Sequence, residues 1–363
     1  MVEKARHYQG LNGLRAIAVT LVFLVHKAYG VSPEFGKSGV WLFFFISGFL
    51  IIGELHRVRR AIESGQSTIS GGLKTFFIRR ALRIFPIYYL LLAVLFVGRR
   101  FYAHFGPDLG FAWHFTYLSN FWMALVLKDW IGPFSHLWSL AVEQQFYLIA
   151  PFAFLLLPTR FHGMICAVCL IVGFSGHALL YAYGAGEIVE YTISPFNFAL
   201  LASGGLMYLA VGRGMRVGRP ALAAAVAIMF IFGSCCMLLS HIPDSAKALS
   251  DLCLSAGIAL VFFIVVTNQH GLLTRCLEWS PLNYLGTISY GFYLFHNFIP
   301  NPVGKALQLF PHINLPDGLQ YTLGLTCGFA LTVVVASFSW RFIERPIMQL
   351  RQRRAVIAPP SAA

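Results

Sequence analysis

The sequence predicts an all-α, polytopic integral membrane protein with about ten transmembrane helices. Of its 363 residues, 58% are hydrophobic and only 11% are charged, which leaves too little polar surface to cover a soluble globule of this length. Apolar stretches long enough to cross a bilayer core of about 30 Å recur from end to end. The net charge of +13 is placed in short loops beside these stretches, which is typical of membrane topology rather than of nucleic-acid binding.

Ten apolar segments are candidate transmembrane helices. In order they are 12–31, 39–56, 76–98, 136–157, 162–183, 195–211, 220–240, 250–268, 282–300 and 318–341. The first is expected to stay as an anchor, because it is long, contains His26 and Lys27, and lacks a small-residue cleavage site. Residues 1–346 are expected to form one transmembrane domain, followed by a tail at 347–363 that is first basic and then rich in Pro and Ala.

The basic residues decide whether an eleventh apolar stretch, Phe111–Leu127, crosses the membrane. If it does not cross and the N-terminus is cytoplasmic, twenty Lys and Arg residues lie inside and six lie outside, with Lys27 at the outer end of the first span. If it crosses, the last ten of those inner residues move outside, against the positive-inside rule. We therefore expect ten spans, one re-entrant or interfacial segment, and both termini cytoplasmic, in the inner (cytoplasmic) membrane.

Two ionisable residues lie within the first span. Arg15 and His26 are eleven residues apart, about 16 Å along a helix axis, so the arginine lies near the cytoplasmic face and the histidine about two-thirds of the way out. Ionisable groups are costly in hydrocarbon and usually mark a functional site. The alternative is a snorkelling arginine and a histidine hydrogen-bonded to a neighbouring helix.

More polar residues are predicted at the depth of His26. Ser139, Glu143 and Tyr147 share one face of 136–157, and Ser289, Tyr293 and His296 share one face of 282–300. Each of them alone is equally compatible with an interhelical hydrogen bond. Their shared depth on three helices favours a site.

The start of segment 76–98 carries Arg79, Arg80 and Arg83. Their spacing places the guanidinium groups where they can converge on one ligand, and guanidinium groups bind phosphates well. The alternative is anchoring to anionic lipid. Three arginines within five residues, continuing into the membrane, favour a phosphate-bearing ligand.

The motifs together resemble those of the membrane-bound acyltransferase family 3. They occur in family order over nearly the whole chain: Gly13-Leu14-Arg15-Ala16 with Arg15-x10-His26, Ser47-Gly48-Phe49-Leu50, the arginine-rich start of 76–98, Trp138-Ser139-Leu140-Ala141-Val142-Glu143, Ile288-Ser289-Tyr290 through His296, and Phe342-Ile343-Glu344-Arg345-Pro346. One departure is Gln144, where many relatives have a second glutamate.

The resemblance implies a ten-helix enzyme that moves an acyl group, commonly acetyl, from cytoplasmic acyl-CoA to a hydroxyl of an extracytoplasmic or lipid-linked saccharide. Its Arg-x10-His motif falls on Arg15 and His26, its Arg-x-x-Arg motif on Arg80 and Arg83, and its glutamate on Glu143. Some relatives carry a fused hydrolase-like domain. Because this chain ends about twenty residues after its last predicted span, we expect a stand-alone form.

On this interpretation the CoA phosphates bind Arg79, Arg80 and Arg83, and Arg15 guides the donor inward. His26 then acts as general base or as acyl carrier, and Glu143 orients it. Candidate acceptor or oxyanion contacts are Ser139, Tyr293, His296 and His136, and the sequence does not choose among them.

No metal and no permanently bound cofactor are expected, and no nucleic-acid partner. The sequence identifies neither the acceptor saccharide, nor the acyl length, nor the oligomeric state. The alternative function is a proton-coupled secondary transporter or flippase for a glycan or lipid-linked precursor. It is less favoured because the two halves of the chain show no inverted repeat.

Overall fold

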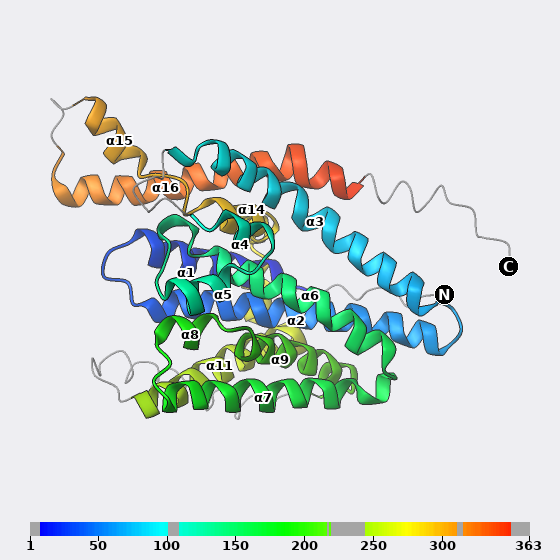
Figure 1. The fold of residues 1–363 in the computed structure, drawn as a ribbon. Helices are drawn as coiled ribbons and strands as arrows, with labels where there is room; N and C mark the ends of the chain where they lie inside the picture. Colours follow the sequence, from blue (N-terminus) through cyan, green and yellow to red (C-terminus); the bar gives the residue numbers. More distant parts are fainter. Residues whose placement is uncertain (1–7, 101–108, 216–217, 219–243, 311–314, 350–363) are drawn as a thin grey trace.

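The computed structural model describes residues 8–100, 109–215, 218, 244–310 and 315–349. Every regular element in these ranges is helical (Figure 1). The long helices are α1 (Leu11–Lys27), α2 (Pro33–Glu63), α3 (Ile69–Val97), α6 (Leu137–Leu156), α7 (His162–Ala182), α9 (Ser194–Gly212), α11 (Asp244–Thr267) and α16 (Asp317–Ser339). The all-α prediction is therefore confirmed for the described residues.

Seven stretches of the described chain are long and apolar enough to cross a bilayer: Pro33–Glu63, Ile69–Val97, Gly132–Leu156, Thr159–Ala182, Glu187–Gly212, Lys247–Thr267 and Asp317–Gln349. Helix α1 has 17 residues, including both Arg15 and His26, and falls just short of that length. The predicted span 220–240 and most of the predicted tail, 350–363, lie outside the described residues.

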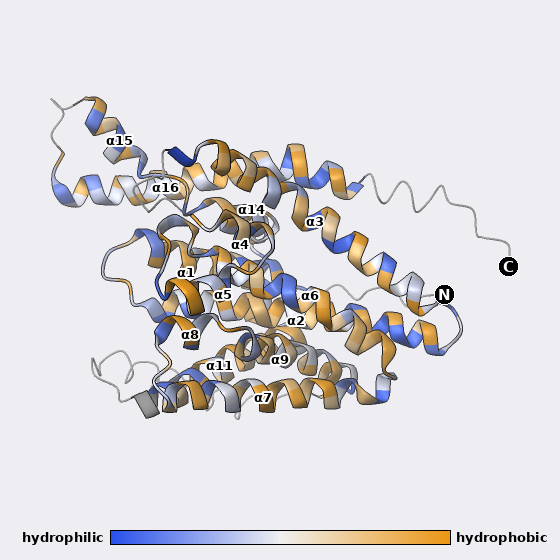
Figure 2. Cartoon of the chain, viewed as in Figure 1, coloured by the Kyte–Doolittle hydropathy of each residue, from blue (hydrophilic) through white to orange (hydrophobic). Residues whose placement is uncertain are grey.

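Hydrophobic residues predominate along the outer helices (Figure 2), and many large ones are exposed, as in a protein surrounded by lipid. Helix α7 is the clearest case, because Met164, Val168, Ile171 and Val172 on it are all exposed. The long helices form three layers, with α7, α9 and α11 on one side of α1, α2 and α6, and with α3 and α16 on the other (Figure 1). Helix α2 packs against α1, α6, α9 and α11, so it is the centre of the fold.

The contact between α2 and α9 depends on two glycines. A Cβ atom added at Gly48 would lie 1.8 Å from the carbonyl oxygen of Leu201, and one added at Gly204 would lie 2.1 Å from the carbonyl oxygen of Phe45. Only residues without a side chain allow two helix backbones to approach this closely. The glycine in the Ser47-Gly48 motif thus has a packing role.

We expect Gly48→Ala to destabilise the bundle by about 1–3 kcal/mol, because overpacking forces the two helices apart. The matched control is Gly176→Ala on α7, where an added Cβ meets nothing within 4 Å and alanine favours the helix. Thermal unfolding of both variants in detergent measures the difference. Equal melting temperatures would show that α2 and α9 tolerate separation.

The segment Phe111–Leu127 forms three short pieces, α4 (Phe111–Phe115), α5 (Ser119–Phe121) and a π-helical turn, η2 (Trp122–Leu127). None is long enough to cross a bilayer, in agreement with the prediction that this segment does not cross. The segment is tied to the long helices by hydrogen bonds, because the Tyr88 hydroxyl donates to the carbonyl of His114 and Gln145 Nε2 donates to that of Tyr117.

The predicted helix 282–300 is not one helix. The chain forms α12 (Leu272–Leu277), α13 (Ser280–Thr287) and α14 (Ser289–Phe295), and the break falls at Ile288, whose ψ is 5°. The break has a packing reason. Helix α13 lies against α1, where a Cβ at Gly286 would come within 1.9 Å of the Asn12 carbonyl oxygen, whereas α14 packs against α16.

After α14 the chain continues into α15 (Pro302–Leu309), and the π-helical turn η5 (Trp340–Glu344) follows α16. Short elements also link the long helices elsewhere: η3 (Gly132–Phe134), η4 (Thr159–Phe161) and α8 (Glu187–Thr192).

Candidate active site

A cavity of about 480 Å³ opens between α1, α2, α3, α6 and the α13–α14 region; we call it the arginine cavity. Five arginines and two glutamates are among its described lining residues: Arg15, Arg57, Arg79, Arg80, Arg83, Glu54 and Glu143. The formal excess of positive charge suits an anionic ligand. Its size falls within the range of about 300–1,000 Å³ that is usual for small-molecule sites.

The three predicted phosphate-binding arginines do line one cavity, but they are not equivalent. Arg79 Nη1 lies 2.7 Å from Glu54 Oε1, and Arg80 Nη2 lies 2.6 Å from Glu54 Oε2. Arg83 has no carboxylate at ion-pair distance within the described chain, and its side chain is exposed to the cavity. Arg15 shares this cavity, and its Nη1 donates to the Asn12 side chain at 3.3 Å.

Glu143 lies in the arginine cavity and not beside His26. One of its carboxylate oxygens accepts hydrogen bonds from the hydroxyls of both Ser47 and Tyr147. No hydrogen bond or ion pair joins Glu143 to His26 within the described chain, and the orienting role of this carboxylate stays a prediction. The described lining of the cavity contains two glutamates. Glu54 pairs with Arg79 and Arg80, whereas Glu143 forms no ion pair with a cavity arginine.

Ser139 and Tyr293 lie where the arginine cavity meets the histidines. Their oxygens are 2.6 Å apart, and both hydroxyls lie within 3.1 Å of the carbonyl oxygen of His136. Two hydroxyl protons serve these three oxygens, so one hydroxyl donates to the carbonyl and the other donates to its neighbour. In this arrangement neither hydroxyl has a proton left for a substrate oxyanion.

His26 pairs with His296 across α1 and the end of α14. Nδ1 of His26 lies 2.9 Å from Nε2 of His296, and Nδ1 of His296 lies 2.6 Å from the carbonyl oxygen of Tyr293. A carbonyl only accepts, so Nδ1 of a neutral His296 carries its proton and Nε2 of that ring is an acceptor. Nδ1 of His26 therefore donates, which leaves Nε2 of His26 with a free lone pair.

This chain of hydrogen bonds gives His26 the tautomer that a base or nucleophile needs. In hydrolytic triads a carboxylate on the far nitrogen fixes that tautomer. Here His296, which is fully buried, takes this position. The sequence suggested His296 as a possible acceptor or oxyanion contact. In the structure His296 instead bonds to Nδ1 of His26, the ring nitrogen opposite the free Nε2.

Both nitrogens of His136 face backbone carbonyl oxygens, and a neutral ring can donate to only one of them. Its Nδ1 lies 2.9 Å from the carbonyl oxygen of Pro133 and its Nε2 lies 3.3 Å from that of Leu294. Its ring packs against those of His26 and His296, with centroids 6.4 and 4.9 Å away. His136 is thus close to His26 and His296, but both of its ring nitrogens face backbone carbonyls. It is therefore poorly placed for the acceptor or oxyanion contact that the sequence suggested.

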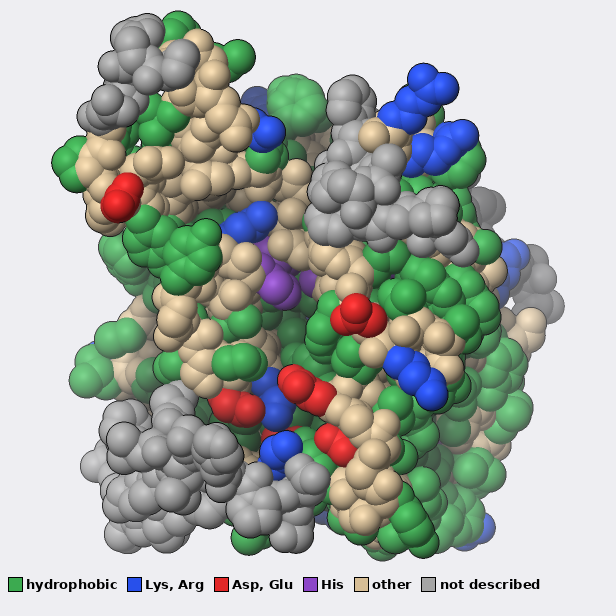
Figure 3. All heavy atoms as spheres, turned by 60° about the vertical axis from the view of Figure 1, so that its left-hand side comes forward, with side chains coloured by type: hydrophobic (Ala, Val, Ile, Leu, Met, Phe, Trp, Pro, Cys, Tyr) green, Lys and Arg blue, Asp and Glu red, His purple; other side chains and the backbone are tan. Residues whose placement is uncertain are grey.

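The side chain of His26 is exposed, although its partner His296 is buried. Figure 3 shows histidine side chains at the bottom of a hollow on the end of the bundle that carries the α1–α2 connection. Next to them on α1, Lys27 Nζ donates to the carbonyls of Asn297 and Ile299 at 3.3 and 3.0 Å. His26 is therefore approached from the end of the bundle opposite to that of Arg15.

Sequence reasoning missed Ser47, Glu54 and Arg57 as residues of the cavity. Ser47 is the first residue of the Ser47-Gly48-Phe49-Leu50 motif, but nothing in that motif indicates a contact with Glu143. Glu54 is an acidic residue near the end of a long apolar segment. Because a charged group there needs a partner, the sequence could have predicted a basic residue beside it on the next helix.

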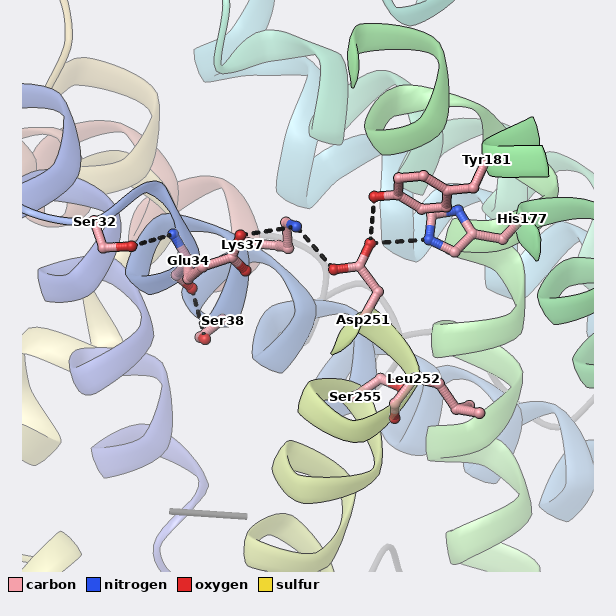
Figure 4. Close-up of polar contacts among 9 residues, drawn as sticks. All are labelled: Ser32, Glu34, Lys37, Ser38, His177, Tyr181, Asp251, Leu252 and Ser255. Carbon is pink, nitrogen blue, oxygen red and sulfur yellow. Dashed lines mark hydrogen bonds and ion pairs between the residues drawn. The ribbon is translucent and has the colours of Figure 1, made fainter. Parts of the chain in front are cut away.

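A second polar cluster lies away from the arginine cavity and joins α2, α7 and α11 (Figure 4). Asp251 accepts from Lys37 at 2.8 Å, from His177 at 3.0 Å and from Tyr181 at 2.8 Å. None of these residues lines the arginine cavity. These contacts join α2, α7 and α11 at one carboxylate, that of Asp251.

Comparisons with known proteins show the family of this chain. A family model described as an acyltransferase domain matches residues 8–341. The chain is 28% identical to peptidoglycan O-acetyltransferase OatA of Listeria monocytogenes, 27% identical to the putative peptidoglycan O-acetyltransferase YrhL of Bacillus subtilis, and 26% identical to O-acetyltransferase OatA of Staphylococcus aureus. These alignments cover 94–96% of this chain and 56–57% of each relative. No solved structure matches.

The family match and the site cover the same stretch of chain. Arg15, Arg83 and Glu143, which line the arginine cavity, and the bonded pair His26 and His296 all fall within the residues that the family model matches. The chain spans little more than half the length of the curated relatives it matches. On the family match over nearly its whole length, this protein belongs to the acyltransferase domain family of membrane acyltransferases.

Proposed function

We propose that this protein is a membrane O-acyltransferase that moves an acyl group, most simply acetyl, from cytoplasmic acyl-CoA to a saccharide hydroxyl on the other side of the membrane. One observation carries the proposal. Nε2 of His26 is free, and His26 is joined through His296 to the backbone of Tyr293, which lines the arginine cavity, so a base or nucleophile is linked by two hydrogen bonds to a site for an anionic donor.

The proposed topology places Arg15 and the arginine cavity on the cytoplasmic side and His26 toward the outside. Ten spans with both termini cytoplasmic fit this orientation, as does a transmembrane domain over 1–346 with a tail over 347–363, in the inner membrane. It is supported by the arginines gathered where α2 ends and α3 begins, since basic residues favour the cytoplasmic side.

In this proposal the donor enters the arginine cavity with its diphosphate toward Arg83 and Arg80. Arg83 has no carboxylate partner in the described chain and therefore needs no rearrangement to bind an anion. Arg79 and Arg80 share Glu54, which holds them in place before the donor arrives. The pantetheine arm then runs between Glu143 and Arg15 toward Ser139 and Tyr293, and brings the thioester to His26.

The chemical step uses the free nitrogen of His26. The acceptor hydroxyl gives its proton to Nε2 while its oxygen attacks the thioester carbonyl carbon. The carbon–sulfur bond then breaks, and the imidazolium returns the proton to the leaving thiolate, which gives the saccharide ester and free CoA. The hydrogen bond to His296 stabilises the imidazolium while it exists.

A covalent route uses the same nitrogen. Nε2 attacks the thioester carbonyl carbon, the carbon–sulfur bond breaks, and the leaving thiolate takes the proton that the imidazolium loses from Nδ1. The saccharide hydroxyl then attacks the carbonyl carbon of the acyl-imidazole, the carbon–nitrogen bond breaks, and the hydroxyl proton returns to the imidazole of His26. Rapid quenching with radiolabelled acetyl-CoA and no acceptor distinguishes the routes, because only the second labels the protein at His26.

The acceptor class follows from the relatives, whose names identify two of them as peptidoglycan O-acetyltransferases or putative ones. We propose peptidoglycan or another cell-envelope saccharide as the acceptor. The hollow that contains histidine side chains (Figure 3) supports an acceptor that arrives from outside.

The test is transfer by the purified protein in vesicles with radiolabelled acetyl-CoA on one side and saccharide fragments on the other. We expect label in an alkali-labile ester that depends on both substrates. Substrate movement that needs no acyl-CoA would instead establish the transporter alternative. In cells, mass spectrometry of envelope saccharides with and without this protein should show the loss of an acyl group.

A further inference from the structure

A second pocket lies beside the arginine cavity. It has a volume of about 350 Å³ and is formed by the end of α2, the end of α9 and the start of α7; we call it the side pocket. Its described lining contains three arginines and a histidine, Arg57, Arg60, Arg213 and His56, and no carboxylate. A concave site with this balance of charge attracts anions.

The side pocket and the arginine cavity share Arg57. Along α2, Glu54 and Arg57 face the arginine cavity, whereas His56, Arg57 and Arg60 face the side pocket. Helical spacing puts residues three apart on adjoining parts of the surface, so Arg57 lies on the border. Its Nη1 donates to the Tyr208 hydroxyl at 3.0 Å, which holds the guanidinium there.

The side pocket also offers aromatic surface. Tyr208 and Tyr8 both line it, and the guanidinium carbon of Arg57 lies 5.7 Å from the centre of the Tyr208 ring. Arginine guanidinium groups and aromatic rings are the surfaces on which nucleotide bases stack. Phosphate-binding arginines beside such surfaces fit a phosphorylated nucleotide better than they fit a simple anion.

We propose that the side pocket binds the 3′-phosphoadenosine end of the acyl-CoA donor, while the arginine cavity holds its acylated pantetheine arm. The proposal rests on the proposed function, since it assigns the other half of the same donor. Arg57 contacts the diphosphate at the border between the two spaces, and Arg60 and Arg213 bind the 3′-phosphate.

The experiment compares acetyl-CoA with acetyl-3′-dephospho-CoA, which differ in that phosphate alone. Affinities are measured for the full-length protein in neutral-lipid nanodiscs. Loss of charge-assisted hydrogen bonds to one phosphate should weaken wild-type binding about tenfold or more. In Arg60→Gln/Arg213→Gln the two donors should bind within about twofold of each other, and the dephospho donor should bind as it does to wild type.

The matched control is Arg59→Gln. Arg59 is on the same helix, next to Arg60, but its Nη1 donates to the Leu155 carbonyl at 2.8 Å and its Nε pairs with Glu63, and it lines neither space. This variant should keep the wild-type preference for the 3′-phosphate. A loss of preference in Arg59→Gln as well would assign the effect to general surface charge and overturn the proposal.

A second measurement needs no variant. Adenosine 3′,5′-bisphosphate, which lacks the pantetheine arm, should displace acetyl-CoA from wild type about tenfold better than adenosine 5′-monophosphate does. Equal displacement, or equal wild-type affinity for the two donors, overturns the side-pocket assignment while leaving the proposed function intact. Wild type that binds neither donor overturns the proposed function itself.

Anionic lipid is the other source of phosphate at this end of the bundle. If the side pocket serves a lipid headgroup, Arg60→Gln/Arg213→Gln will lower binding of phosphatidylglycerol from mixed vesicles and leave the preference for the 3′-phosphate unchanged. That outcome contradicts the proposal.

Discussion

His26→Ala should abolish acyl transfer, with a loss of at least about 100-fold, while acetyl-CoA still binds within about twofold of wild type. A positioned base contributes about 10²–10⁴-fold to the rate, and Nε2 of His26 is the free histidine nitrogen in the cluster of His26, His136 and His296. His26 is outside the lining of the arginine cavity, so donor binding should survive. Alanine also suits the interior of α1.

The measurement is saccharide acylation in membranes that contain matched amounts of each variant, together with binding of radiolabelled acetyl-CoA. His296→Phe is the informative partner. It removes the acceptor that fixes the tautomer but leaves Nε2 of His26 in place, so we expect a partial loss. Normal transfer by His26→Ala would remove His26 from the mechanism and leave it as a helix-packing group.

Glu143→Gln should behave differently from His26→Ala. Because Glu143 lies among the cavity arginines and accepts from Ser47 and Tyr147, its loss is expected to change donor affinity as well as turnover. An effect on turnover alone, with donor binding unchanged, would restore the direct role beside His26 that the sequence suggested.

Arg83→Gln should weaken acetyl-CoA binding by about tenfold to a hundredfold. A hydrogen bond to a charged group contributes about 1.5–3 kcal/mol, and each 1.4 kcal/mol is a tenfold change. Arg83 lines the cavity with no carboxylate partner in the described chain, so it is the arginine best prepared for an anion. Arg79→Gln should cost less, because Glu54 already engages that side chain.

Equilibrium binding of radiolabelled acetyl-CoA to the purified variants checks this order. Arg341→Gln is the control, since it removes an exposed arginine of η5 that lies outside the cavity lining. Insertion into the membrane should be unchanged in all three. Wild-type affinity in Arg83→Gln and in Arg80→Gln/Arg83→Gln would return these arginines to the role of topological anchors.

The sequence by itself determined the class of the protein and the depth of its polar groups. Long apolar runs with few charges have one physical solution, which is helices in lipid, and Arg15 and His26 had to lie about 16 Å apart once their segment was helical. It also indicated that Phe111–Leu127 does not cross, because a crossing there reverses the placement of ten basic residues. Each of these inferences uses only local spacing or composition.

The partners of each polar group were decided by the tertiary structure. From the sequence, Glu143 was predicted to orient His26, and His296 was a possible acceptor or oxyanion contact, since their depth alone does not show which of them faces His26. The break at Ile288 turns α14 so that His296 reaches His26, while Glu143 faces Ser47 and Arg83 in the cavity. Helical periodicity gives the face of a residue but not the rotation of one helix against another.

The same reason explains Glu54 and the side pocket. The sequence indicated no acidic partner for Arg79 and Arg80. Only the packing of α2 against α3 brings the carboxylate of Glu54 to both of them. Arg57, Arg60 and Arg213 looked like separate topological charges, and only the ends of α2 and α9 bring them together. The sequence shows which polar and charged groups a helix carries, and tertiary packing decides which of them meet, because contacts such as that between His26 and His296 join residues 270 positions apart.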